Sequence, residues 1–291
     1  MGDKNLWGGT THFAVEDGGW FKERDAFQMT RRIFRSIPWT SYVHMRQSAR
    51  WEDLPWRQVH ARRVLVAAAF NPPNQDHKQG LPKESRNLRR LLNRTCASWP
   101  SECTFAGARM PSKDSAAEPV RELAHLYSQS TFCLQPMGDS VTRKAILDAL
   151  LLGCINVLFH PLQLRHWPWH WGGWIMRATV FLDYKAVLKG QIDPIATLKA
   201  TRPADIRQMQ RTLAEHAHCM HYADLAEPES NVSDVAAVLG SAPDAFDILL
   251  RGAWELAQNA SLAWQRHGVG RLPGQRRSAK ELCEPVPWTT K

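Results

Sequence analysis

The feature that most restricts the fold of this chain is a strand–loop–helix–strand pattern within residues 131–159. Residues 131–134 (TFCL) and 154–159 (CINVLF) are short apolar runs of the kind that form buried strands. Between them, residues 142–152 have helical spacing, and Gly153 stands where a helix C-terminal cap is expected. Two strands joined through a helix form a βαβ unit, which produces a parallel sheet with a right-handed crossover. The pattern therefore predicts an α/β fold.

Apolar runs outside this unit predict further elements of the same two kinds. Residues 63–70 (RVLVAAAF) are typical of a buried strand followed by a loop, and residues 180–182 are a further candidate strand. Apolar residues at helical spacing predict helices over 86–96, 120–129, 192–200, 204–220 and 244–259.

Changes in composition predict where the chain divides. Residues 106–119 carry Gly, Pro, Ser and Asp and are typical of a linker. The residues from 270 onward are polar and basic, and we expect them to be loosely ordered. These breaks predict a partial first domain over 1–119, a second domain over 120–268 and a basic tail over 269–291.

Charge and hydropathy restrict the class of partner. The net charge of +9 would suit nucleic acid, acidic membranes or anionic ligands such as nucleotide diphosphates. The basic residues are spread along the chain without a nucleic-acid-binding motif, so a nucleic-acid-binding protein ranks last among the alternatives. No run of about 18 apolar residues and no signal-peptide core occur, so the chain as written is expected to be cytosolic.

The six cysteines form no CxxC pair, which argues against a structural zinc site. Cys96 and Cys103 could form a local disulfide in a secretory compartment, or a free pair in the cytosol. Cys133 and Cys154 lie in the apolar strands, where we expect buried thiols.

The loop of residues 135–141 follows a predicted strand and leads into a helix, which is where an open parallel sheet binds ligands. Exposed amides and the helix dipole at such a place favour a phosphate. Gly138 permits a close approach, and Ser140 or Thr142 could cap the helix and donate to a phosphate oxygen. Arg143 adds a planar fork of donors that suits a diphosphate.

Asp148 lies about one and a half turns further along this helix, where its carboxylate could accept hydrogen bonds from ribose hydroxyls. The alternative reading of the same residues is an ordinary turn with a helix cap and a surface arginine. The chemistry of the residues alone leaves both readings open.

The longer motif over residues 132–161, FCLQPMGDSVTRKAILDALLLGCINVLFHP, resembles the signature of the exostosin family of glycosyltransferases (family 47). It is particularly similar to the plant branch that includes xyloglucan galactosyltransferases. Weaker similarity runs from about residue 8 to residue 260, including residues 9–13 (GTTHF) and residues 37–39 (IPW).

The resemblance implies a GT-B fold with two Rossmann-like domains, of which the N-terminal, acceptor-side domain looks truncated here. It implies an inverting hexosyltransferase that moves a sugar, galactose as the first guess, from a UDP-sugar to a hydroxyl of a polysaccharide or glycoprotein glycan. No cofactor or metal is implied beyond the UDP-sugar co-substrate. The implied location is the Golgi lumen or membrane, with this chain as a fragment of a longer protein.

By motif position, the resemblance also assigns the donor site. The residues implied to bind the donor are Gly138, Asp139, Ser140, Thr142, Arg143, Lys144 and Asp148. Two departures from the family pattern favour another alternative, an inactive partner subunit of a second glycosyltransferase: Asn156 replaces a proline of the motif, and only eight residues precede the GTTHF segment.

Two further groups are candidate site residues. His12 could be the acceptor-side base, or an ordinary loop histidine. Trp167, Trp169 and Trp171 could form a platform for a sugar ring, or pack at a domain interface. Pro168 interrupts the helix that a metal site built from the neighbouring histidines would need.

Overall fold

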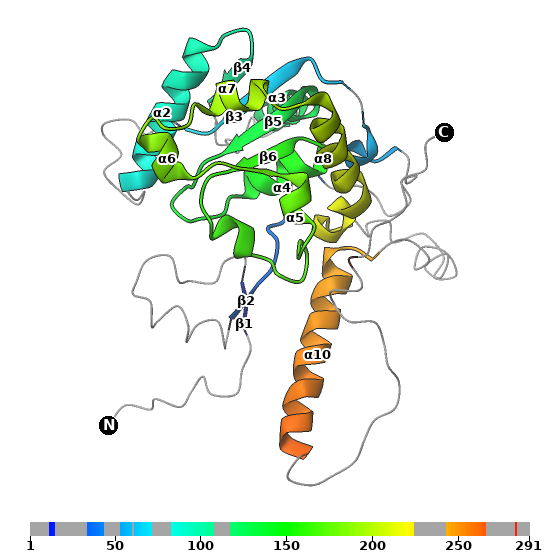
Figure 1. Ribbon diagram of the computed structural model, residues 1–291. Coiled ribbons are helices and arrows are strands. Elements are labelled where there is room, and N and C mark those ends of the chain that lie inside the picture. Colours follow the sequence, from blue (N-terminus) through cyan, green and yellow to red (C-terminus); the bar gives the residue numbers. More distant parts are fainter. Residues whose placement is uncertain are drawn as a thin grey trace.

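The structure is a computed structural model that describes residues 12–14, 34–43, 53–59, 61–71, 83–107, 117–223, 243–265 and 283. Its centre is a five-stranded sheet in the order β4-β3-β5-β6-β7 (Figure 1). The strands are β3 (Val64–Ala69), β4 (Cys103–Ala106), β5 (Ser130–Gln135), β6 (Ile155–Leu158) and β7 (Val180–Phe181). Every neighbouring pair is parallel, which confirms the predicted α/β class.

The strand order corrects the predicted domain boundary between residues 119 and 120. The strands β3 and β4 come from the predicted first domain, yet β3 lies between β4 and β5 in the one sheet. The residues from β3 to β7 therefore build a single Rossmann-like layer, because a strand paired on both edges cannot belong to a different domain.

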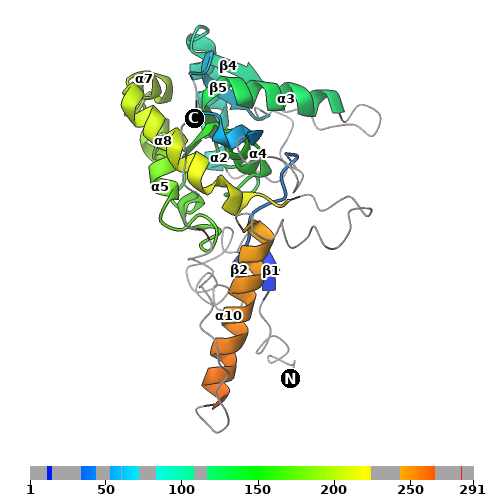
Figure 2. The ribbon, with the colours of Figure 1, turned by 90° about the vertical axis from the view of Figure 1, so that its right-hand side faces the viewer.

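Helices cover both faces of this sheet (Figure 2). The face that carries Cys133 packs on α3 (Ala117–Gln129) and α4 (Lys144–Leu151). The opposite face packs on α2 (Lys83–Ser98) and α7 (Pro194–Lys199). The remaining described helices are α5 (Ile175–Ala178), α6 (Tyr184–Leu188), α8 (Pro203–His216) and α10 (Ala245–Gln265), with 3-10 turns η2 (Pro55–Arg57), η3 (Gln163–Arg165) and η4 (Ala217–Met220).

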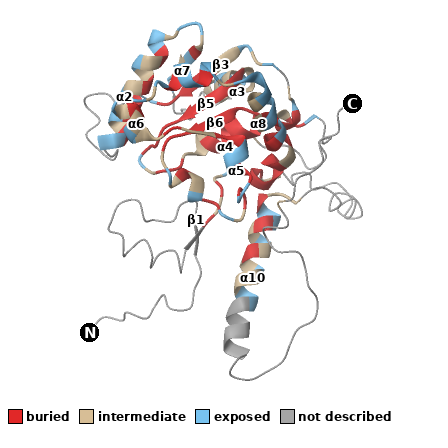
Figure 3. Cartoon of the chain, in the orientation of Figure 1, coloured by how far each residue is buried: buried red, intermediate tan, exposed pale blue. Residues whose placement is uncertain are grey.

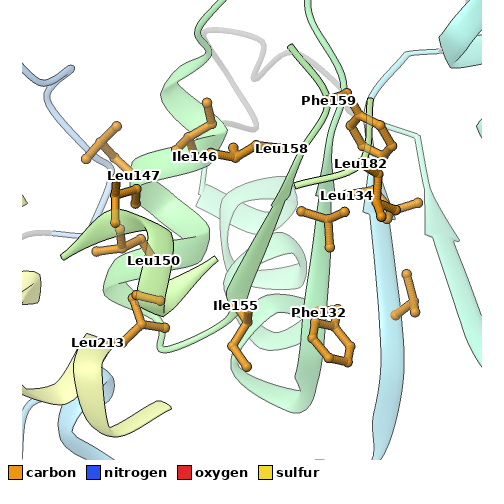
Figure 4. Close-up of a cluster of buried hydrophobic side chains, with 14 of the residues drawn as sticks. Phe132, Leu134, Ile146, Leu147, Leu150, Ile155, Leu158, Phe159, Leu182 and Leu213 are labelled. Atoms are coloured by element: carbon orange, nitrogen blue, oxygen red, sulfur yellow. The ribbon is translucent and has the colours of Figure 1, made fainter. Parts of the chain in front are cut away.

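The core fills the space between these layers (Figure 3). Figure 4 shows aliphatic side chains of α4, such as Ile146 and Leu150, together with Ile155 of β6 and Leu213 of α8. At the end of α4, Gly153 has a φ of 72°, and its N–H donates to the carbonyl of Leu150. The N–H of Cys154 donates to the carbonyl of Ala149. These two bonds are a Schellman motif, which confirms the predicted glycine cap.

Two elements lie outside this body. The strands β1 (His12–Ala14) and β2 (Phe34–Ser36) pair in parallel as a separate two-stranded sheet. Helix α10 projects away from the α/β body (Figures 1 and 2). Its outer side exposes about half of Phe246, Leu250 and Trp254, which follow one another at helical spacing.

Three disulfides pair all six cysteines: Cys96–Cys103, Cys133–Cys154 and Cys219–Cys283. The first confirms one of the two predicted alternatives. The second corrects the prediction of buried thiols, because adjacent parallel strands bring the Cα atoms of Cys133 and Cys154 to 6.0 Å. The third ties residue 283, part of the predicted loose tail, to η4.

Among the described residues, no helix combines the length and apolar character that crossing a bilayer requires.

Candidate functional site

The turn of residues 136–143 joins the carboxyl end of β5 to the amino end of α4. Both neighbours of β5 run parallel to it, so the turn lies at the carboxyl edge of the sheet. This is the location that the sequence predicts for a ligand site in an open parallel sheet.

Hydrogen bonds within the turn fix its shape. The N–H of Gly138 donates to the carbonyl of Ser140 (2.9 Å), and the hydroxyl of Ser140 donates to the carbonyl of Thr142 (3.0 Å). Neither residue is the N-cap, because α4 begins at Lys144 and its N-cap residue is Arg143. The prediction of Ser140 or Thr142 as the N-cap is therefore wrong. The side chain of Arg143 makes no capping bond, so the N-cap residue supplies no acceptor to the first amides of α4, which suits an anion-binding helix end.

Helix α2 supports the turn from below. The hydroxyl of Ser85 and the Nε of Arg89 both donate to the carbonyl of Met137, at 2.7 and 2.8 Å. Burial of the Arg89 guanidinium lowers its pKa to about 9, and the neighbouring Arg143 acts in the same direction. Arg89 was not among the predicted site residues, although a charged residue next to Leu88 on the apolar side of a predicted helix is a signal.

Arg143 points inward beneath the turn. Its Nη2 donates to the carbonyl of Ala69 at the end of β3 (3.0 Å), whereas its buried Nη1 has no hydrogen-bond partner within the described part of the chain. Burial lowers the pKa of Arg143. Gly138 lies between the guanidinium of Arg89 and the aliphatic part of the Arg143 side chain, since a Cβ there would lie 3.1 Å from Arg89 Nη2 and 3.6 Å from Arg143 Cγ. The structure thus concentrates positive charge and an unused donor beside the turn.

The predicted donor-binding residues Lys144 and Asp148 contact each other. The Nζ of Lys144 lies 2.7 Å from both carboxylate oxygens of Asp148. The same carboxylate accepts hydrogen bonds from the hydroxyl of Ser41 (2.6 Å) and the N–H of Tyr42 (2.9 Å). Burial lowers the pKa of Lys144, and Asp148 opposes the shift. The carboxylate is therefore engaged by its own chain, and its contact with a ribose stays a prediction.

Two side-chain amides tie the start of α4 to the sheet. Gln135 at the end of β5 donates to the carbonyl of Ala145 (3.1 Å), and Asn156 in β6 donates to the carbonyl of Ile146 (2.9 Å). Asn156 stands where the family motif has a proline, which has no side-chain donor for this bond. The departure thus adds a tether to the candidate site.

The remaining candidates belong to other segments of the chain. The backbone of His12 belongs to β1, and its side chain lies outside the described part of the chain. Trp167 and Trp171 are 0% and 1% exposed and belong to the core, which corrects the platform prediction for these two residues. A buried indole has no free face for a sugar. Trp169 is half-buried and contacts Gly252 of α10.

The described residues contain no group of three or more His, Cys, Asp or Glu side chains placed to hold a metal ion. The donor set around the turn consists of amides, hydroxyls and guanidinium groups, which suit an anion.

The chain matches a known protein family. Residues 7–185 match the family model described as the Exostosin GT47 domain. This match contains β1 to β7 and the whole candidate turn.

The chain is also similar to curated proteins of Arabidopsis thaliana. It is 28% identical to xyloglucan-specific galacturonosyltransferase 1 over 220 residues, covering 74% of this chain and 30% of that protein. It is 25% identical to xyloglucan galactosyltransferase MUR3 over 222 residues (73% and 31%), and 36% identical to probable xyloglucan galactosyltransferase GT12 over 129 residues (43% and 23%). The matched region thus spans about a third or less of the length of each of these three relatives.

Proposed function

The chain belongs to the Exostosin GT47 domain family, and we propose that it is the donor-binding part of an inverting glycosyltransferase. In this proposal a UDP-sugar, with galactose as the first candidate, supplies the sugar. A hydroxyl of a cell-wall polysaccharide such as xyloglucan accepts it. The relatives named above support the acceptor class, since their names specify xyloglucan.

The observation that carries the proposal is the free amino end of α4. The side chain of its N-cap residue, Arg143, makes no capping bond to the first amides, and the buried Nη1 of Arg143 has no hydrogen-bond acceptor among the described residues. Both can donate to a diphosphate, which supplies several acceptor oxygens. Positive charge from Arg89 and Arg143 adds an attractive field for the same anion.

The proposed step is a displacement at the anomeric carbon of the sugar. The acceptor oxygen bonds to this carbon while the bond from the carbon to the β-phosphate oxygen breaks, and the hydroxyl proton passes to a base. Negative charge grows on the departing UDP, where the α4 amides and Arg143 would stabilise it. His12 is the proposed base, on the basis of family resemblance.

We further propose that the enzyme has the GT-B architecture and acts in the Golgi lumen. The five-stranded sheet would be the donor domain, and the parallel pair β1–β2 would belong to the sheet of the acceptor domain. Three disulfides support passage through an oxidising compartment, because such bonds are rare in the cytosol.

A binding-only partner subunit is the second candidate. It is favoured by the carboxylate of Asp148, which is already engaged by Ser41, Tyr42 and Lys144. Intact UDP binding without release of UDP from UDP-galactose, in the presence of xyloglucan oligosaccharides, would select this candidate.

Calorimetric titration with UDP, UMP and uridine tests the proposal. We expect UDP to bind most tightly, and Arg143→Ala to weaken UDP by about tenfold to a hundredfold while changing uridine little. Arg63→Ala, at an exposed arginine, is the matched control and should bind UDP as the unmodified protein does. Equal affinity for UDP and uridine would rule out a diphosphate site at this turn.

A further inference from the structure

A short segment links the N-terminal strands to the candidate turn. Residues 37–43 (IPWTSYV), called the strap here, follow β2 directly. The indole Nε1 of Trp39 donates to the hydroxyl oxygen of Thr142 at 3.2 Å. The strap therefore reaches the last part of the turn just before α4 begins.

The strap also forms hydrogen bonds to α4 farther along the helix, at Asp148. The Oδ1 of Asp148 accepts from the Ser41 hydroxyl at 2.6 Å and from the N–H of Tyr42 at 2.9 Å. The Nζ of Lys144 lies 3.1 Å from the centre of the Tyr42 ring while it contacts the same carboxylate. Three residues of the strap thus contact Thr142 just before α4 and both Lys144 and Asp148 within the helix.

The outer side of the strap is fixed as well. The hydroxyl of Tyr222, which follows η4, donates to the carbonyl of Pro38 at 3.1 Å. The hydroxyl of Ser36, at the end of β2, accepts a bond from the N–H of Trp167 at 2.9 Å. Trp167 has a φ of 52°, a conformation that a buried tryptophan adopts only where the surroundings impose it. The strap is therefore held between the sheet and the base of α10.

These contacts require the burial of polar groups, which costs free energy and is unusual for a segment that only connects two elements. Asp148 and Ser41 are 5% and 6% exposed, so the strap buries a carboxylate and a hydroxyl. Burying such groups is unfavourable unless they are paired, and here the partners are more than a hundred residues apart in sequence. Apolar packing would attach the strap more simply, but it would not fix the direction of the turn.

We propose that the strap is a positioning element for the candidate donor site, with Asp148 as its anchor on α4 and Trp39 as its contact with the turn. This inference rests on the proposed function. Asp148 then acts through Ser41 and the strap rather than by touching the ribose. Movement of β2 would change the orientation of the turn, which couples the two parts of the molecule.

Amide hydrogen exchange without ligand, followed by UDP titration, tests this inference. The variants are Ser41→Ala and Trp39→Phe, each of which removes one donor, and Ser41→Thr, which keeps the hydroxyl. Ser98→Ala is the matched control, because the exposed Ser98 hydroxyl only bonds within α2. Far-UV circular dichroism and exchange in β3 and β5 verify that each variant is folded.

We expect Ser41→Ala and Trp39→Phe to speed amide exchange over residues 138–146 and to weaken UDP binding by about tenfold. Trp39→Phe removes one hydrogen bond, whereas Ser41→Ala removes the bond to Asp148 and also the bond that the Ser41 hydroxyl accepts from the N–H of Val43. Ser41→Thr and Ser98→Ala should stay within about twofold of the unmodified protein. The ratio of UDP to 2′-deoxy-UDP affinity should be the same in Asp148→Asn as in the unmodified protein.

Two results would overturn the inference. One is unchanged exchange over residues 138–146 in both Ser41→Ala and Trp39→Phe. The other is a change in the UDP to 2′-deoxy-UDP ratio in Asp148→Asn with normal UDP binding by Ser41→Ala, which would make Asp148 a ribose ligand. If the unmodified protein binds no UDP, the proposed function fails, and the exchange data still decide whether the strap positions the turn.

Discussion

At the scale of single residues, Arg62 does more for the fold than its position before β3 suggests. Its Nη1 lies 3.0 to 3.3 Å from the carbonyls of Tyr127, Ser128, Ser130 and Leu152, which belong to the ends of α3 and α4 and the start of β5. Burial lowers the pKa of Arg62 to about 10. One cation thus satisfies carbonyls that a helix end leaves without partners.

We expect Arg62→Ala to lower the free energy of unfolding by about 2 to 4 kcal/mol, because several buried carbonyls lose their hydrogen-bond donor at once. The neighbouring Arg63 is exposed, and Arg63→Ala should change the stability by no more than about 0.5 kcal/mol. Urea unfolding of both variants makes the comparison. Equal midpoints for the two would show that the carbonyls find water instead.

At the scale of elements, one of the contacts that attach α10 to the body requires a glycine. A Cβ at Gly252 would overlap the indole of Trp169, so helix and loop meet at the closest possible distance. Gly252 is buried, whereas Phe246, Leu250 and Trp254 on the other side of α10 are half exposed. The helix is therefore held along one side only in the described part of the chain.

Replacing Gly252 by alanine should reverse the usual effect of this change. Inside a helix, glycine to alanine normally stabilises by about 0.5 to 1 kcal/mol. Here we expect a loss of about 1 to 3 kcal/mol from overpacking against Trp169. In a Trp169→Ala background, the change Gly252→Ala should lower the free energy of unfolding by less than it does in the unmodified protein. A rise in melting temperature for the single variant would contradict this contact.

The elements themselves were predictable where the signal was local. The strands β5 and β6 were predicted within one residue at each end, because continuous apolar runs mark buried parallel strands. The strand β4 was missed, since a four-residue edge strand needs little apolar pattern. The start of α4 was placed at Thr142 instead of Lys144, and the long-range contact from Trp39 to Thr142 carries no sequence signal.

In the candidate site too, the features with a local sequence signal were predictable and the long-range contacts were not. The location of the turn, with Gly138 and Arg143 in it, could be predicted from residue types beside a predicted strand end. The support from Ser85 and Arg89 and the anchoring of Asp148 by Ser41 depend on how distant elements meet. Only the folded chain reveals such partners.

At the scale of the whole molecule, buried histidines make the fold sensitive to mild acid. Burial lowers the pKa of His170 to about 4 and that of His218 to about 3. The Nδ1 of His170 is buried without a hydrogen-bond partner, so a proton there would be unpaired. Both residues are neutral in the folded chain at any pH near neutrality.

A histidine in the unfolded chain has a pKa near 6.5, so below that pH the unfolded state binds protons that the folded state does not bind. Stability should be constant above about pH 7 and fall below about pH 6.5, by at most about 1.4 kcal/mol per pH unit for each such histidine, until the pH reaches about 4 for His170 and about 3 for His218. Urea unfolding at several pH values measures the slope. His170→Gln should reduce it, and an unchanged slope in that variant would show that other groups cause the loss.

The bond between Cys219 and Cys283 joins residues 64 positions apart, and α10 lies between them. The protruding helix is therefore part of a covalent ring rather than a free end. A protease that cuts once inside this ring opens it without releasing a piece, so the nicked protein should migrate as one species until a reducing agent separates the fragments. The arm that reaches farthest from the body is thus also one that a single cut cannot remove.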